Sequence, residues 1–215
     1  MWTTLLAAAW AADPPSDPRA AVALLGADRL DQVGELSFAF VVERGGEVKV
    51  NRRWSWRPAD GSVTLRVGDA EPVTFTFGKP STDAEKQADA QFVNDTFWLM
   101  PQLHLSWAGP ADPIVTDGGE VARPIGDGAA HLVTLQYAAA GGGYTPGDAY
   151  DLYLDADGKI VAWAYWKGGK TGPAPSLVTT SEGYVQAGPL TLATEHHTAD
   201  GSFRVSFADV GVTPR

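Results

Sequence analysis

Apolar and polar residues alternate over most of this 215-residue chain, and that alternation limits its fold more than any other feature. Successive side chains of a β-strand point to opposite faces, so a period of two indicates strands with one apolar face. The sequence therefore predicts consecutive antiparallel strands. The residues that share an apolar face fall into these groups: Leu36, Phe38, Phe40 and Val42; Val48, Val50, Trp54 and Trp56; Val63, Leu65 and Val67; Val73, Phe75 and Phe77; Val133, Leu135 and Tyr137; Tyr150, Leu152 and Leu154; Leu190 and Leu192; Phe203, Val205 and Phe207.

Turn sequences separate these groups. "RGGE" at 44–47, "LDADGKI" at 154–160 and "ADG" at 199–201 predict hairpin turns, and "VAWAY" after the second turn predicts another strand. "PADP" at 110–113 and "GGGYTPGD" at 141–148 predict loops, because proline and glycine clusters interrupt regular structure. No linker or fixed repeat divides the strands, so we expect one folded domain.

Two segments carry helix signals. The first is "RAAVALLGADRL" at 19–30, which follows a capping Asp17 and a first-turn proline. The second begins near Ser81 or Thr82, where a side-chain oxygen can cap the helix, and it ends at Pro101. A strand is expected after this proline, with these residues on its apolar face: Leu103, Leu105 and Trp107.

The N-terminal segment changes character abruptly. Residues 1–11 are largely apolar and end in Ala9-Trp10-Ala11, the small-residue spacing of a signal peptidase site, so they predict an export signal. Residues 12–17 are then a linker and residues 18–215 the folded domain. A frayed tail is the alternative, because no Lys or Arg precedes the apolar residues. The sequence has no cysteine, so we expect a free periplasmic protein without disulfides, thiolate metal sites or a lipid anchor.

The net charge of −10 argues against two classes of partner. Nucleic acids and anionic membrane surfaces are bound through basic patches, which this composition does not favour. The apolar N-terminal stretch is also too short to span a bilayer. We expect a monomer without a membrane span, with a neutral, apolar or cationic partner.

Many aromatic residues lie on the predicted apolar faces. An apolar sheet face must be covered, and two helices are few for that purpose. Incomplete cover would leave a cavity with apolar walls, which is the usual character of a ligand pocket. The alternative is that Trp54, Trp56, Trp98 and Trp107 pack together as ordinary core.

Arg52 is the one polar residue on the face that Val50, Trp54 and Trp56 share. In a regular strand its guanidinium would lie beside two indoles, where it could hold a lipid carboxylate or phosphate. The alternative, which we favour, is a bulge that turns the side chain outward or an ion pair at the barrel mouth.

Catalytic and metal signals are weak. "AYWKGGKT" at 164–171 resembles a phosphate-binding loop, but the following "GPAPS" provides no helix N-terminus, so a plain loop is predicted. His196 and His197 are adjacent on a strand and point to opposite faces, so they cannot easily share a metal ion. His104, on the opposite face of the strand expected after Pro101, and His131 are isolated. We therefore predict a non-enzymatic protein without metal or cofactor.

Four segments resemble the LolA-like envelope proteins, also called outer-membrane lipoprotein-sorting proteins. They are "RRWSWRPADG" at 52–61, "FVNDTFWLMP" at 92–101, "TPGDAYDLYLDADGKIVAWAY" at 145–165 and "GPLTLATEH" at 188–196. The resemblance covers nearly everything after the export segment. It implies an α+β fold, a single-domain incomplete antiparallel β-barrel with helices covering its concave apolar face.

The resemblance also implies a function. The concave face would enclose a cavity for acyl chains, and the protein would be a periplasmic carrier that exchanges an acylated or lipid ligand between a membrane-protein donor and acceptor. A sensor or scaffold domain with a vestigial cavity and, less favoured, a hydrolase of lipid-like substrates are the alternatives. The expected cavity wall consists of these residues: Phe38, Phe40, Arg52, Trp54, Trp56, Phe75, Phe77, Phe92, Trp98, Leu103, Leu105, Trp107, Trp163 and Tyr165.

Overall fold

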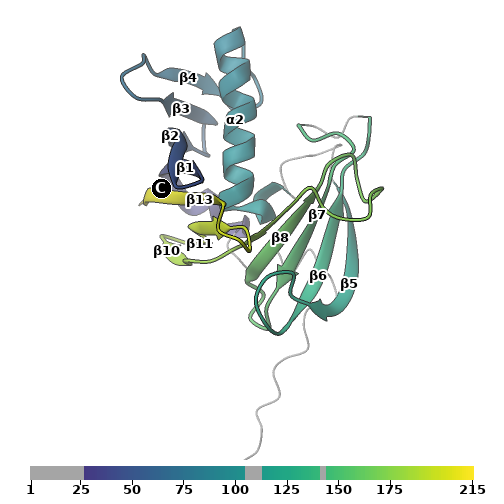
Figure 1. Cartoon of the computed structure of the whole chain (residues 1–215). Helices are drawn as coiled ribbons and strands as arrows, with labels where there is room; N and C mark the ends of the chain where they lie inside the picture. The colour runs from purple at the N-terminus through teal and green to yellow at the C-terminus, as the bar shows by residue number, and fades with distance from the viewer. Residues whose placement is uncertain (1–26, 105–112, 141–143) are drawn as a thin grey trace, which may run out of the picture.

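A computed structural model describes residues 27–104, 113–140 and 144–215 (Figure 1). Its strands form two antiparallel sheets and a small hairpin, β10-β11. The larger sheet has the order β12-β13-β1-β2-β3-β4, and the smaller sheet has the order β5-β6-β7-β8-β9. The elements have these bounds: η1 Ala27–Gln32, β1 Val33–Arg44, β2 Glu47–Arg57, β3 Ser62–Arg66, β4 Val73–Thr76, α2 Asp83–Leu99, η2 Pro101–Leu103, β5 Ile114–Ala122, β6 Ala129–Gln136, β7 Ala149–Leu154, β8 Ile160–Trp166, β9 Leu177–Thr180, β10 Val185–Ala187, β11 Leu190–Leu192, β12 Glu195–His197 and β13 Phe203–Pro214.

The alternating groups of the sequence match these strands. Each group lies in a strand or extends one residue beyond its end, as Val67, Phe77 and Tyr137 do. The prediction missed β5, β9 and β10. In β5 the sequence "IVTDGGEVA" interrupts the alternation with two glycines, and its pairing with β6 is irregular between Asp117 and Gly119. An edge strand that is largely exposed to solvent needs no continuous apolar face, so it leaves little signal in the sequence.

The two sheets meet where β9 lies beside β12. The Nδ1 atom of His196 is 3.0 Å from the carbonyl oxygen of Thr180, and the backbone N–H of His197 donates to Thr180 Oγ1 at 3.1 Å. At the opposite ends, β4 and β5 are each the last strand of their sheet. The sheets therefore form an open, curved structure rather than a closed barrel, and this confirms the predicted α+β half-barrel.

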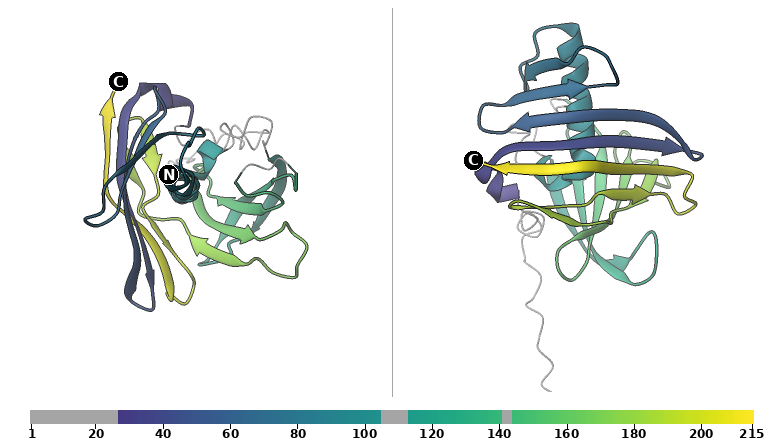
Figure 2. Two further views of the ribbon diagram at one scale, coloured as in Figure 1. Left: turned by 90° about the horizontal axis from the view of Figure 1, so that it is seen from above. Right: turned by 90° about the vertical axis from the view of Figure 1, so that its left-hand side faces the viewer.

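Helix α2 runs between the two sheets (Figure 2). Thr82 caps its N-terminus, because Thr82 Oγ1 accepts from the N–H of Glu85 while the Glu85 carboxylate accepts from the N–H of Thr82. The helix ends at Leu99, directly before Met100 and Pro101. The predicted start and end of this helix are confirmed.

Two other predictions for the helices and their surroundings need correction. Of the helix expected at 19–30, residues 19–26 lie outside the described residues, and Ala27–Gln32 forms a 3-10 helix instead. The strand expected after Pro101 does not begin there, because Pro101–Leu103 forms the 3-10 turn η2. Proline is favoured at the first position of such a turn, since its φ is already fixed at a helical value. Leu105 and Trp107 lie outside the described residues.

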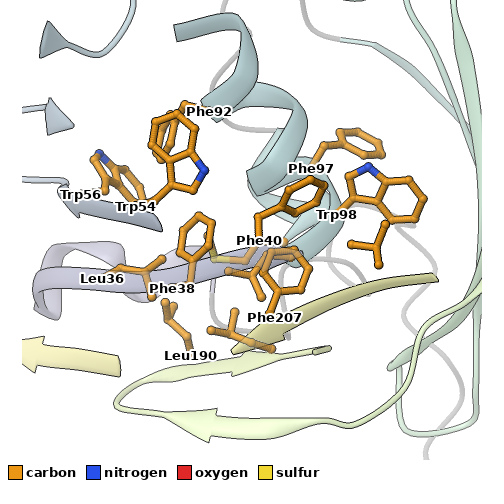
Figure 3. Packing of buried hydrophobic residues seen from close by; sticks show 14 of the residues in the cluster. Leu36, Phe38, Phe40, Trp54, Trp56, Phe92, Phe97, Trp98, Leu190 and Phe207 are labelled. Atoms are coloured by element: carbon orange, nitrogen blue, oxygen red, sulfur yellow. The ribbon is translucent and has the colours of Figure 1, made fainter. Parts of the chain in front are cut away.

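The middle of α2 packs against the larger sheet in an aromatic core around Phe92 (Figure 3). Phe92 is fully buried, and its ring contacts Trp54, Trp56 and Phe77 edge to face at centroid distances of 5.3, 5.7 and 5.6 Å. Such contacts stabilise beyond the area that they bury. This core fixes α2 against β2 and β4.

Candidate ligand-binding cavity

A cavity of about 700 Å³ lies between α2 and the concave sides of the two sheets. Both sheets, the helix and the loop before β7 contribute to its walls. Aromatic and aliphatic side chains make up most of the wall, with three cationic side chains among them. The lining residues are Phe40, Val42, Arg44, Lys49, Val50, Arg52, Phe77, Ala90, Val93, Asn94, Phe97, Trp98, His104, Tyr137, Tyr144, Thr145, Asp148, Tyr150, Trp163, Tyr165, Leu177, Phe203 and Val205.

The residues expected in the cavity wall divide into two described sets. Six line the cavity: Phe40, Arg52, Phe77, Trp98, Trp163 and Tyr165. Five are buried in the hydrophobic core without bordering the cavity: Phe38, Trp54, Trp56, Phe75 and Phe92. Leu103 lies in η2, and Leu105 and Trp107 lie outside the described residues. The alternation identifies the concave face correctly, but α2 fills part of that face, so only the remainder borders open space.

The last turn of α2 supplies one aromatic wall. Trp98 contacts Trp163 at a centroid distance of 4.4 Å, and Phe97 contacts Tyr150 at 4.2 Å. Tyr150 in turn stacks on Tyr165 at 5.3 Å. The wall thus continues from the helix onto the concave face of β7 and β8.

Tyrosines form much of the second wall, and the prediction included only one of them. Tyr165 donates to Asp148 at 2.9 Å, and Tyr144 donates to Asp89 on α2. Burial and the nearby Asp148 raise the pKa of Tyr165 to about 12, and burial also raises the pKa of Tyr150. These phenols remain neutral at physiological pH. The segment 137–150 carried only a loop signal and part of an alternating group, so nothing in it marked a cavity wall.

Arg52 occupies the apolar face and forms an ion pair. Its Nε and Nη2 atoms donate to Asp95 at 2.7 and 2.6 Å, while its guanidinium lies 5.0 Å from the centre of the Phe40 ring. Trp54 Nε1 also donates to Asp95, at 2.8 Å. The ion-pair alternative is therefore the observed one, although the pair spans from β2 to α2. Burial raises the pKa of Asp95, and the hydrogen bonds from Arg52 oppose that shift.

His104 is buried and lines the cavity, which corrects its expected place on an outward strand face. The error follows from the missing strand, because η2 turns the chain after Pro101. His104 Nε2 lies 3.3 Å from Thr96 Oγ1, and the ring packs on Phe97 at 4.9 Å. Burial lowers the pKa of His104 to about 3, so the imidazole is neutral at physiological pH.

The motifs that resemble catalytic sites have structural roles. In the segment 164–171, which was expected to be a loop, residues 164–166 form the end of β8 and turns follow. In these turns the Lys170 ammonium donates to both carboxylate oxygens of the buried Asp151, at 2.9 and 3.0 Å. His196 is buried whereas His197 is partly exposed, as their opposite orientations predicted. "LDADGKI" forms the hairpin turn between β7 and β8. No group of His, Asp and Glu that could hold a metal occurs among the described residues.

Comparisons with solved structures identify the fold. A LolA superfamily protein from Nitrosomonas europaea superposes with a TM-score of 0.51 at 9% identity, over 91% of this chain and 93% of that one. This chain has a LolA-like fold. A DUF1329 family protein from Desulfovibrio piger superposes over 94% of both chains, with a TM-score of 0.47 and 13% identity. The sequence itself matches no family profile and no curated protein. Within the described residues, no helix has the length and apolar character needed to cross a membrane.

Proposed function

We propose that this protein binds and carries a hydrophobic, acylated ligand in its cavity and performs no chemistry on it. The cavity volume of about 700 Å³ carries this proposal. Small-molecule pockets typically measure roughly 300 to 1,000 Å³ and have mainly apolar walls. Phe40, Trp98 and Trp163 supply such walls from three elements, so an acyl chain would contact aromatic side chains along its length.

The titratable groups in the wall support binding rather than catalysis. Asp148 accepts hydrogen bonds from the Tyr165 hydroxyl and from the N–H of Gly168, at 2.9 and 2.7 Å. His104 is held against Thr96 and Phe97 with its pKa lowered to about 3. A general acid or base should have a pKa near the working pH, and the pKa of His104 lies far below it.

The open fold supports exchange of the ligand. Because β4 and β5 are the ends of their sheets, the concave side can be reached without breaking strand pairs. We therefore extend the proposal to an exported, monomeric, periplasmic carrier that receives its ligand from one membrane protein and delivers it to another. A sensor domain with a vestigial cavity would need no exchangeable ligand.

Native mass spectrometry of protein purified from an envelope fraction tests this function. We expect a co-purifying acylated molecule that solvent extraction removes, after which a fluorescent fatty-acid probe binds with one-to-one stoichiometry. Protein that carries no ligand and takes up no probe after extraction would contradict the carrier function and favour the sensor alternative. Arg53→Gln, on the convex face, is a matched control that should leave probe binding unchanged.

A further inference from the structure

The charges in the cavity wall differ from the charge of the chain as a whole. The protein has a net charge of −10, yet among the described residues the wall contains Arg44, Lys49 and Arg52 and a single carboxylate, that of Asp148. Net charge describes the average surface and says little about a single pocket. The cavity is therefore locally more basic than the composition suggests.

Local backbone geometry explains why two of these cations face the cavity. Arg44 has the same parity on β1 as Phe40 and Val42, which also line the cavity. On β2 the register shifts, because Val42 pairs with Val50 whereas Glu43 pairs with Val48. Lys49 is the extra residue of this bulge. Bulges commonly redirect a side chain, and here the bulge adds Lys49 to the wall.

The three cations are not equally neutralised. Arg52 is paired with the buried Asp95, and Lys49 pairs with Glu47 at an exposed site. Arg44 lies over the Phe203 ring at 5.1 Å, and no carboxylate of the described residues lies within ion-pair distance of it. Asp148 faces Tyr165 and Gly168, which already donate to it. At the hairpin end of β1 and β2, Arg44 thus offers the cavity a positive charge without a carboxylate partner, and Lys49 adds a second cation whose exposed partner Glu47 does not line the cavity.

We propose that the cavity takes an anionic amphiphile, with its carboxylate or phosphate headgroup at Arg44 and Lys49 and its chain against Phe40, Trp98 and Trp163. This proposal rests on the carrier function and specifies the ligand class. It replaces the neutral, apolar or cationic partner expected from net charge. Guanidinium and ammonium groups both bind such headgroups through charge-assisted hydrogen bonds, while the aromatic walls accept the chain.

Four probes with the same twelve-carbon chain test the proposal: dodecanoate, dodecyl phosphate, methyl dodecanoate and dodecylammonium. Each probe is added below its critical micelle concentration. It competes with a neutral fluorescent reporter for protein from which solvent extraction has removed any co-purified ligand. We expect the two anions to bind more tightly than the ester, and the ammonium most weakly. Raising the salt concentration should weaken the binding of the two anions and leave the binding of the ester unchanged.

The double variant Arg44→Gln/Lys49→Gln locates the effect. Its affinity for dodecanoate should fall roughly tenfold, because two partly exposed ion pairs with the headgroup are lost together. Its affinity for the ester should not change. The matched control Arg53→Gln/Arg66→Gln removes two arginines that are direct cross-strand neighbours on β2 and β3, and it should change neither affinity. A difference between dodecanoate and dodecyl phosphate would identify the preferred headgroup.

The outcomes separate this proposal from the carrier function. Equal binding of all four probes, or tightest binding of the ammonium, would overturn the anionic headgroup and leave the carrier intact. An equal loss for acid and ester in the double variant would show a structural effect and would also overturn it. If no probe binds wild-type protein, the carrier function fails and the headgroup proposal fails with it.

Discussion

Phe92 and Trp98 lie about two turns apart on α2, yet they have different surroundings. Phe92 is fully buried among Trp54, Trp56 and Phe77 of the larger sheet. Trp98 contacts Trp163 of the smaller sheet and borders the cavity. The difference shows that one apolar concave face can serve as core and as cavity wall. On the larger sheet, Trp54 and Trp56 of β2 are closed against Phe92, whereas Arg52 of the same strand and Phe40 of β1 border the cavity.

The largest effect should come from the closed region. Phe92→Ala removes a ring with three aromatic contacts and leaves a void, so it should lower the free energy of unfolding by about 3 to 5 kcal/mol. Urea denaturation of extracted protein measures this loss. A loss below about 1 kcal/mol would mean that the Phe92 region collapses easily and is not a rigid core.

The second-largest effect should be a decrease in the free energy of unfolding at mildly acidic pH. Burial lowers the pKa of His104 to about 3 and of His196 to about 4, from 6.5 in both cases. The unfolded chain therefore binds protons that the folded protein excludes, so stability falls as pH drops below 6.5. At pH 5.5 the two residues together should cost about 2 to 3 kcal/mol relative to pH 8.

Urea midpoints at the two pH values test this prediction, and histidine variants divide it between the two regions. His104→Phe, in the cavity wall, and His196→Phe, where the two sheets meet, should each remove about half of the decrease. An unchanged decrease in the double variant would assign the effect to other groups.

The open region should respond more through binding than through stability. Trp98→Ala removes contacts with Trp163, His196 and Phe203, but part of the Trp98 side chain borders the cavity instead of packed atoms, so the ligand-free protein should lose about 2 kcal/mol of unfolding free energy. Affinity for the fatty-acid probe should fall at least tenfold. If Trp98→Ala costs as much stability as Phe92→Ala and leaves probe binding intact, the two regions are equivalent.

The smallest effect is expected on the convex face. Arg53 pairs with Asp209 at 2.7 Å, and both side chains are more than half exposed. Arg53→Gln should therefore change stability by no more than about 0.5 kcal/mol and should leave probe affinity unchanged. A clear loss of binding in this variant would show that ligand affinity depends on the whole sheet rather than on the cavity wall.

Much of the fold was predictable because its signals are local. Alternation identified most strands, and Thr82 with Glu85 marked the start of α2. The division between core and cavity was not predictable, since Phe38 and Phe40 belong to the same alternating group, yet of the two only Phe40 borders the cavity. The Arg52 and Asp95 ion pair joins residues from β2 and α2 that the sequence separates widely. The tyrosine wall was missed because β7 and the loop before it carry no residue pattern specific to a cavity.

Quenching of tryptophan fluorescence by a brominated dodecanoate tests the central claim, because bromine quenches only indoles that the chain contacts. All four tryptophans belong to the buried hydrophobic cluster, but Trp98 and Trp163 line the cavity and Trp54 and Trp56 do not. We predict strong quenching in wild-type protein and in Trp54→Phe/Trp56→Phe, and a large loss of quenching in Trp98→Phe/Trp163→Phe, with the unbrominated chain confirming that each protein still binds. Quenching that survives the Trp98→Phe/Trp163→Phe substitution and disappears in Trp54→Phe/Trp56→Phe would contradict the account.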